Sequence, residues 1–166
     1  MSSDLSTRRR VSYARGYLGL EMFRQAGAEL DAIAPADQSL PEVLGVRVDL
    51  HMAARQWERV VDVGRRLAEA YPETEHAWIG WAYALRELGR IEEARSVLLE
   101  AEAHHGRTSA VLHYNLACYD ALLGALKSAR ARFARACRME KRFKEEGRHD
   151  PDLKALWAAG GGPLSE

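Results

Sequence analysis

The chain has 166 residues, of which 47% are hydrophobic and 29% are charged, a composition typical of one soluble helical domain. Its 24 Lys and Arg residues balance its 24 Asp and Glu residues, which argues against a general attraction to nucleic acid or to an acidic membrane surface. Its two cysteines, Cys118 and Cys137, make neither a disulfide framework nor a metal-type cluster. No run approaches the roughly 18 apolar residues of a membrane span, and Arg15 and Glu21 interrupt any secretory signal, so we expect a cytoplasmic protein.

Four copies of one helical hairpin are predicted to follow one another along the chain. Each copy has a sharp corner between its two helices, and the corner residues, spaced by 34, 34 and 35 residues, are Glu21, Arg55, Gly89 and Gly124. This period sets the repeats, within residues 7–140, at about 7–40, 41–74, 75–109 and 110–140. Around them we expect a disordered N-terminus over 1–6, a C-terminal capping segment over 141–158 and a flexible tail over 159–166.

The same residue types recur at fixed distances from each corner. Small side chains stand seven residues before it, at Ala14, Val48, Ala82 and Ala117, and five residues after it, at Ala26, Val60, Ala94 and Ala129. Two further columns, mostly apolar, are Leu30, Gly64, Leu98 and Phe133, and Ile33, Leu67, Ala101 and Ala136. Small residues let two helices cross closely, so these four columns predict the core of each hairpin.

Some positions depart from this pattern. Arg47 stands in the column of Tyr13, Trp81 and Leu116, and Asp120 stands in the column of Tyr17, His51 and Leu85. Gly64 leaves a gap, which we expect the indole of Trp78 or Trp81 to fill because cores tolerate few voids. The corners at Glu21 and Arg55 lack glycine.

The connections between repeats carry helix-start signals. Pro41 suits the first turn of a helix, and Thr74 and Ser109 are predicted to cap the helices that follow them. The segment 34–39 is predicted to be a plain loop. After the last repeat, a short helix is predicted to cover the fourth unit with Phe143, Leu153, Leu156 and Trp157.

The stretch from His76 to Ala103 resembles the tetratricopeptide repeat (TPR), a helix–turn–helix unit of about 34 residues. Trp78, Trp81 and Ala82 before the corner Gly89, and small and apolar residues after it, carry the resemblance. The ending of the chain is similar to that of short bacterial TPR proteins. The resemblance implies an all-α fold, a right-handed α–α superhelix (solenoid) of four helical hairpins with a C-terminal capping helix, and work as a partner-binding scaffold.

In such a superhelix the first helix of every repeat lines a concave groove. Here that groove is predicted to carry an apolar and aromatic stripe flanked by charges, which suits an amphipathic helix or an extended peptide. Its residues are Arg15, Asp49, Met52, Ile79, Tyr83, Arg86, Tyr114 and Cys118. We therefore predict a non-enzymatic scaffold or adaptor that binds a protein or peptide partner, without cofactor, metal, membrane or small-molecule substrate.

Other interpretations remain open. The protein is alternatively a structural subunit of a homo- or hetero-oligomeric assembly, or a secretion-type chaperone. TPR domains that grip the C-terminal carboxylate of heat-shock chaperones use Lys, Asn and Arg at groove positions, and this set is absent at Val11, Arg15, Val46, His76 and Gly80. Nine basic residues between Lys127 and Arg148 predict either a contact for an acidic partner or nucleic acid, or a solvated helix face; we favour the solvated face.

Overall fold

The computed structural model describes residues 5–158, and over this range the regular structure is entirely helical. The flexible tail predicted at 159–166 and residues 1–4 of the predicted N-terminal segment lie outside the described residues. The chain forms two compact units, one ending at Leu88 and the other beginning at Gly89.

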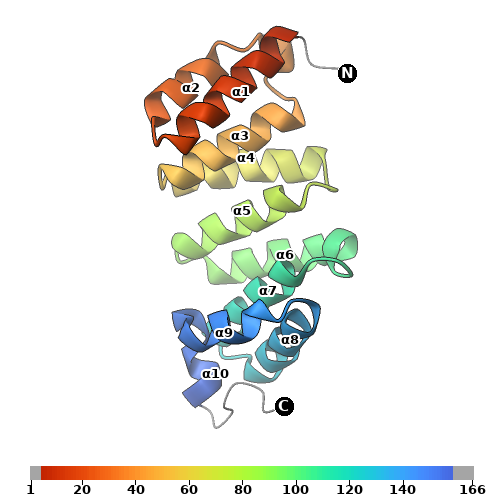
Figure 1. Cartoon of the computed structure of the whole chain (residues 1–166). Coiled ribbons are helices and arrows are strands. Elements are labelled where there is room, and N and C mark those ends of the chain that lie inside the picture. Colours follow the sequence, from red (N-terminus) through yellow and green to blue (C-terminus); the bar gives the residue numbers. More distant parts are fainter. Residues whose placement is uncertain (1–4, 159–166) are drawn as a thin grey trace. The chain divides into compact units, whose positions relative to one another are not determined.

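The first unit contains five α-helices and one short 3₁₀ helix, which lie side by side in chain order (Figure 1). The helices are α1 (Leu5–Gly19), α2 (Phe23–Asp31), η1 (Pro35–Asp37), α3 (Pro41–Ala53), α4 (Trp57–Ala70) and α5 (Glu75–Glu87). Because α1 begins at Leu5, the last two residues of the segment expected to be disordered, 5 and 6, are helical. The helices α1, α3 and α5 are the first helices of the predicted repeats.

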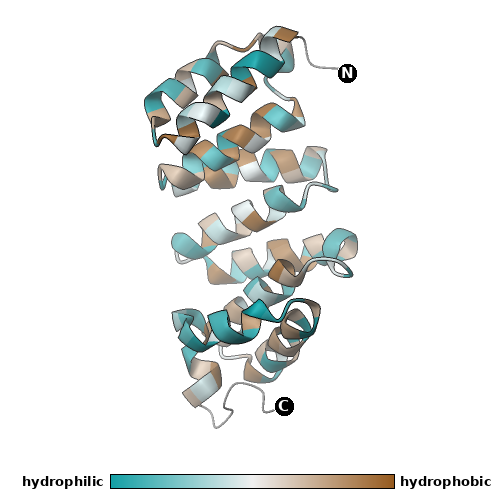
Figure 2. Cartoon of the chain, in the orientation of Figure 1, coloured by the Kyte–Doolittle hydropathy of each residue, from teal (hydrophilic) through white to brown (hydrophobic). Residues whose placement is uncertain are grey.

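The second unit contains the remaining helices. They are α6 (Ile91–His105), α7 (Ala110–Leu122), α8 (Leu126–Met139), α9 (Arg142–His149), η2 (Pro151–Leu153) and α10 (Lys154–Ala158). The last three form a C-terminal segment that contacts α7 and α8. Helix α9 is almost entirely hydrophilic (Figure 2), and its one large apolar side chain, Phe143, is buried together with Leu153 and Leu156.

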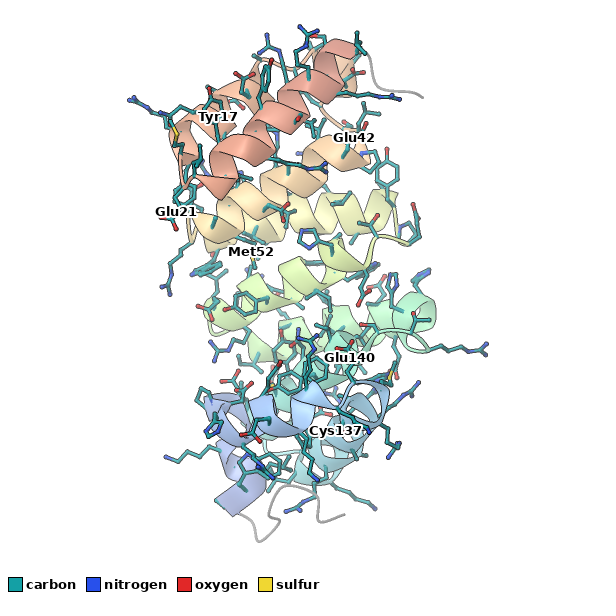
Figure 3. All side chains as sticks on the ribbon, viewed as in Figure 1. Tyr17, Glu21, Glu42, Met52, Cys137 and Glu140 are labelled. Atoms are coloured by element: carbon teal, nitrogen blue, oxygen red, sulfur yellow. The ribbon has the colours of Figure 1, made fainter. Side chains whose placement is uncertain are left out.

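All four predicted corner residues adopt the left-handed backbone conformation. The φ angle is +57° at Glu21, +54° at Arg55, +76° at Gly89 and +77° at Gly124. Figure 3 shows Glu21 at the turn that joins α1 to α2. The 34-residue period is thus confirmed in the backbone, including the two corners where a residue with a Cβ atom replaces glycine.

The columns predicted to form the core are buried throughout. The eight small residues on either side of the four corners are all 0% exposed, and the two following columns are buried as well. In the first repeat, Ala14, Ala26, Leu30 and Ile33 form one hydrophobic cluster with Val11, Val43, Val46 and Leu50. Fixed spacing therefore identified the packed face of each helix.

The polar side chains that interrupt the apolar columns form hydrogen bonds or ion pairs with nearby residues. Arg47 donates to the Gln38 side chain at 2.7 Å and pairs with Asp31 at 3.0 Å. The Asp120 carboxylate, 1% exposed, accepts hydrogen bonds from Arg95 and Ser128. Both polar departures are therefore paired as burial requires.

The gap at Gly64 is filled differently from the prediction. A Cβ atom at Gly64 would lie 3.1 Å from Trp81 Cβ and 3.4 Å from Trp81 Cα. The backbone of α5, rather than an indole ring, therefore approaches α4 at this point. Glycine permits the close approach because it has no side chain.

The connections also differ in part from expectation. Residues 35–37 form η1 instead of a plain loop, and the Gln38 amide donates to the carbonyls of Leu30, in the last turn of α2, and Ile33, just after it. Pro41 begins α3 and the Ser109 hydroxyl accepts from the Leu112 amide, as predicted. Thr74 precedes α5 but makes no side-chain capping bond.

Candidate partner-binding face

The exposed sides of α1, α3 and α5 share one surface in the first unit, which we call the first-helix face. It carries six of the predicted groove residues, Arg15, Asp49, Met52, Ile79, Tyr83 and Arg86. Three of them, Arg15, Asp49 and Tyr83, stand six residues before their corners and are exposed, whereas the residues seven before the corners are fully buried. Helical geometry thus turns one side chain inward and its neighbour outward in each of these three repeats.

A histidine–carboxylate pair lies in the middle of this face. His76 Nε2 is 2.7 Å from Asp49 Oδ1, and both side chains are about half exposed. The hydrogen bond to Asp49 raises the pKa of His76 above its ordinary value, because it favours the protonated ring. Asp49 therefore already has a hydrogen-bonding partner on this face.

An aromatic pair lies at the corner end of the face. The rings of Tyr83 and Trp57 meet edge to face with centroids 5.9 Å apart, and Tyr83 remains 40% exposed. The Arg55 guanidinium stands 5.7 Å from the Trp57 ring centroid, within the range of a cation–π contact. Such an arrangement offers a partner a large, pre-ordered apolar surface with a polar edge.

The remaining residues of the face are half-buried. Met52, near the C-terminal end of α3 in Figure 3, and Ile79 supply apolar surface between the charged positions. Arg86 pairs with Glu87 at 2.6 Å, and Glu87 also lies 3.9 Å from Arg55. The charged side chains at the corner end of the face therefore pair with one another.

Tyr114 and Cys118 do not line an open surface, contrary to the prediction. In the second unit the C-terminal segment covers them, leaving Tyr114 8% and Cys118 4% exposed. Phe143 stacks on the Tyr114 ring with centroids 4.5 Å apart, and the Asp150 carboxylate accepts the Tyr114 hydroxyl at 2.7 Å and the Cys118 thiol at 3.7 Å. Burial and this hydrogen bond raise the pKa of Tyr114.

Many of the basic side chains between Lys127 and Arg148 serve the second unit itself. Arg132 binds the Glu102 carboxylate through two nitrogens, and Arg135 donates to the Gly106 carbonyl. Arg130 donates to the Leu156 carbonyl at 3.1 Å, while Arg142 and Arg148 pair with glutamates nearby in the sequence. These contacts favour a structural role for the basic stretch.

The histidines also have local partners. His113 is fully buried, with Nε2 2.8 Å from the Gly106 carbonyl, and burial lowers its pKa. His51 Nδ1 lies 2.8 Å from the Gln56 side-chain oxygen, and burial lowers its pKa too. Among residues 5–158 no three His, Cys, Asp or Glu side chains gather in a way that could hold a metal ion. None of the helices in this range is long and apolar enough to cross a membrane.

Sequence reasoning missed three contributors to these surfaces. From the sequence, Trp57 received no role, and His76 was weighed only as a position where a carboxylate-gripping residue is absent. Asp150 was not singled out, although its position before Pro151 marks a helix start, where an acidic residue is common. The spacing of the repeats could have placed His76 beside Asp49, but not the fold of the C-terminal segment.

Comparison with solved structures identifies the fold. The chain is similar to a thermophilic TPR protein of Thermus thermophilus (20% identity, 93% of this chain and 83% of that one, TM-score 0.69). It is also similar to PilW, a widely conserved type IV pilus biogenesis factor (17% identity, 95% and 73%, TM-score 0.76). A third similar structure is YrrB, a TPR protein with an unusual peptide-binding site (14% identity, 90% and 75%, TM-score 0.71). No protein-family model and no curated protein matches the sequence.

Proposed function

We propose that this chain, which has the tetratricopeptide-repeat fold, is a non-enzymatic adaptor that holds a segment of a partner protein on its first-helix face. The observation that carries the proposal is the outward side chain at one equivalent position of three successive first helices, Arg15, Asp49 and Tyr83. TPR proteins as a class bind protein or peptide partners, and YrrB is named for a peptide-binding site.

The composition of the face supports a peptide or helix as the ligand. Tyr83 and Trp57 present an aromatic anchor, and Met52 and Ile79 continue the apolar surface. A few aromatic anchors commonly supply most of the binding energy of an interface. We therefore expect truncation of Tyr83 to weaken binding more than truncation of an exposed tyrosine elsewhere.

A second candidate function rests on a different surface. Helix α1 and the turn after it expose Leu5, Tyr13 and Leu20, which are 72%, 53% and 70% exposed. Such an apolar set on a terminal repeat suits a fixed contact in a homo- or hetero-oligomeric assembly. A secretion-type chaperone would bind its client on the first-helix face. The cytoplasmic location expected from the sequence stays a prediction.

One experiment separates the two candidates. The full chain would be used to capture partners from its own host's lysate, with the variants Tyr83→Ala and Tyr13→Ala run in parallel and helicity checked by circular dichroism. A partner lost by Tyr83→Ala and kept by Tyr13→Ala supports the first-helix face. The reverse pattern, together with an oligomer of the pure protein in sedimentation velocity that Tyr13→Ala dissociates, supports the assembly contact. Retention by both variants refutes both assignments.

A further inference from the structure

The second unit contains a bound segment that shows what a first helix of this protein can hold. On α7 the positions ten and six residues before the corner are Tyr114 and Cys118. They receive the carboxylate of Asp150, through the hydroxyl at 2.7 Å and the thiol at 3.7 Å, beside the stacked ring of Phe143. A side-chain carboxylate next to an apolar group therefore occupies this pair of positions within the chain itself.

Of the same pair of positions on α1, the one six residues before the corner is exposed. The equivalent residues are Val11 and Arg15, and they line a shallow pocket of about 300 Å³ together with Arg8, Ser12 and Glu42. Val11 is buried and supplies an apolar wall, and Ser12 supplies a hydroxyl. Figure 3 shows Glu42 at the start of α3, the helix that packs beside α1.

The charge of this pocket favours an anion. Arg8 and Arg15 bring two guanidinium groups to its lining and Glu42 one carboxylate; Arg8 already takes part in another interaction, so the preference for an anion rests on Arg15. The Arg15 side chain is exposed and makes no ion pair with any residue between 5 and 158. An arginine without a carboxylate partner is a ready donor for one, because a charged acceptor strengthens its hydrogen bonds.

The equivalent positions on the other two helices select different groups. On α3 the outward residue is Asp49, whose own carboxylate repels an acidic group and is held by His76. On α5 the pair is Ile79 and Tyr83, an apolar side chain and an exposed aromatic ring. The repeats therefore differ in chemistry along one face, and α1 is the helix suited to a carboxylate.

We infer that the pocket of α1 binds an aspartate or glutamate side chain that stands beside an apolar residue in the partner segment. The inference rests on the proposed function and adds the chemistry of the ligand. A single negative charge fits better than a doubly charged phosphate, because the Glu42 carboxylate lines the same pocket and repels added negative charge.

The test uses three pools of heptapeptides with acetylated N-termini and amidated C-termini. The central residue is Asp, Asn or phosphoserine, and its neighbours are mixtures of Leu, Phe and Ala. Binding is followed by amide chemical shifts of the ¹⁵N-labelled full chain, at Val11, Ser12 and Arg15 for α1 and at Met52, Ile79 and Tyr83 for the rest of the face. The blocked termini leave the side chain as the source of the acidic group.

We expect the Asp pool to shift the α1 amides with a dissociation constant about three- to tenfold below that of the Asn pool. Arg15→Gln should abolish this preference, and Arg9→Gln, which removes an exposed arginine outside the pocket on the same helix, should keep it. Glu42→Gln should enlarge the preference because it removes the opposing carboxylate. Raised salt should weaken it.

Equal binding of the Asp and Asn pools at α1 would overturn the inference, as would tighter binding of the phosphoserine pool. Shifts confined to α3 and α5 overturn the carboxylate site and leave the proposed function standing. An absence of shifts on all three helices with every pool counts against both. An equal loss of the preference in Arg9→Gln and Arg15→Gln would show a general charge effect and also overturn the site.

Discussion

Replacing the corner residue Glu21 with glycine should stabilise the first unit. Glu21 has a φ angle of +57° and an exposed side chain, and the two glycine corners show the same conformation at +76° and +77°. The turn is held by backbone bonds, from the Glu21 amide to the Leu18 carbonyl at 3.0 Å and from the Met22 amide to the Tyr17 carbonyl at 2.9 Å. Neither bond depends on the side chain.

The magnitude follows from two opposing effects. A left-handed conformation costs a residue with a Cβ atom about 1–2 kcal/mol. Glycine relieves this cost, but the greater conformational freedom of the unfolded chain at glycine offsets about 0.5–1 kcal/mol of the gain. Glu21→Gly should therefore raise the free energy of unfolding by up to about 1.5 kcal/mol.

Urea denaturation followed by circular dichroism measures the change, with Glu21→Ala as the matched control. Alanine removes the carboxylate and keeps the Cβ atom, so its unfolding free energy should stay near that of the parent. If Glu21→Ala stabilises the protein as much as Glu21→Gly, the gain comes from the lost charge and the argument from backbone strain is refuted. Destabilisation by Glu21→Gly would refute it as well.

Two further predictions concern the pH dependence and the packing of the C-terminal segment. The raised pKa of His76 means that its pair with Asp49 contributes fully to stability below about pH 6.5, the ordinary value, and that the contribution is lost as pH rises through the raised pKa. An NMR titration of His76 should show the pKa falling in Asp49→Asn, and an unchanged pKa would contradict the assignment. Gly147→Ala should destabilise the second unit by about 1–3 kcal/mol, because the new Cβ would lie 2.6 Å from Phe133 Cζ. Gly16→Ala on α1, where no atom lies within 4 Å, is the control in the same urea titration and should be neutral or stabilising; equal effects of the two substitutions would count against the packing argument.

The period of the sequence predicted most of the fold because it reflects packing. Ala82 and Ala94 recur at fixed distances from Gly89, and a core position tolerates little change in size. The distance of Arg15 and Tyr83 from their corners likewise predicted that both side chains are exposed, since neighbouring side chains in a helix point in different directions. The sequence therefore predicted the corners, the buried columns and the exposed residues of the first unit.

The fourth repeat could not be predicted in the same way. Whether Tyr114 faces solvent depends on where Phe143 and Asp150 lie, and these residues belong to a segment without a repeat partner in the sequence. Helix α9 is nearly all hydrophilic, so its apolar pattern gives little sign of the face it uses. Position in a repeat predicts which side of a helix a residue occupies, but not what else the chain places there.

The covering of α7 by the C-terminal segment has a consequence for valency. At the position six residues before the corner, the chain leaves Arg15, Asp49 and Tyr83 open and closes Cys118 with its own Asp150. A chain shortened to end at Met139 would uncover a fourth such position, and with it the rings of Tyr114 and Phe133. The residues after the last repeat thus set how many of these positions the protein leaves open to other molecules.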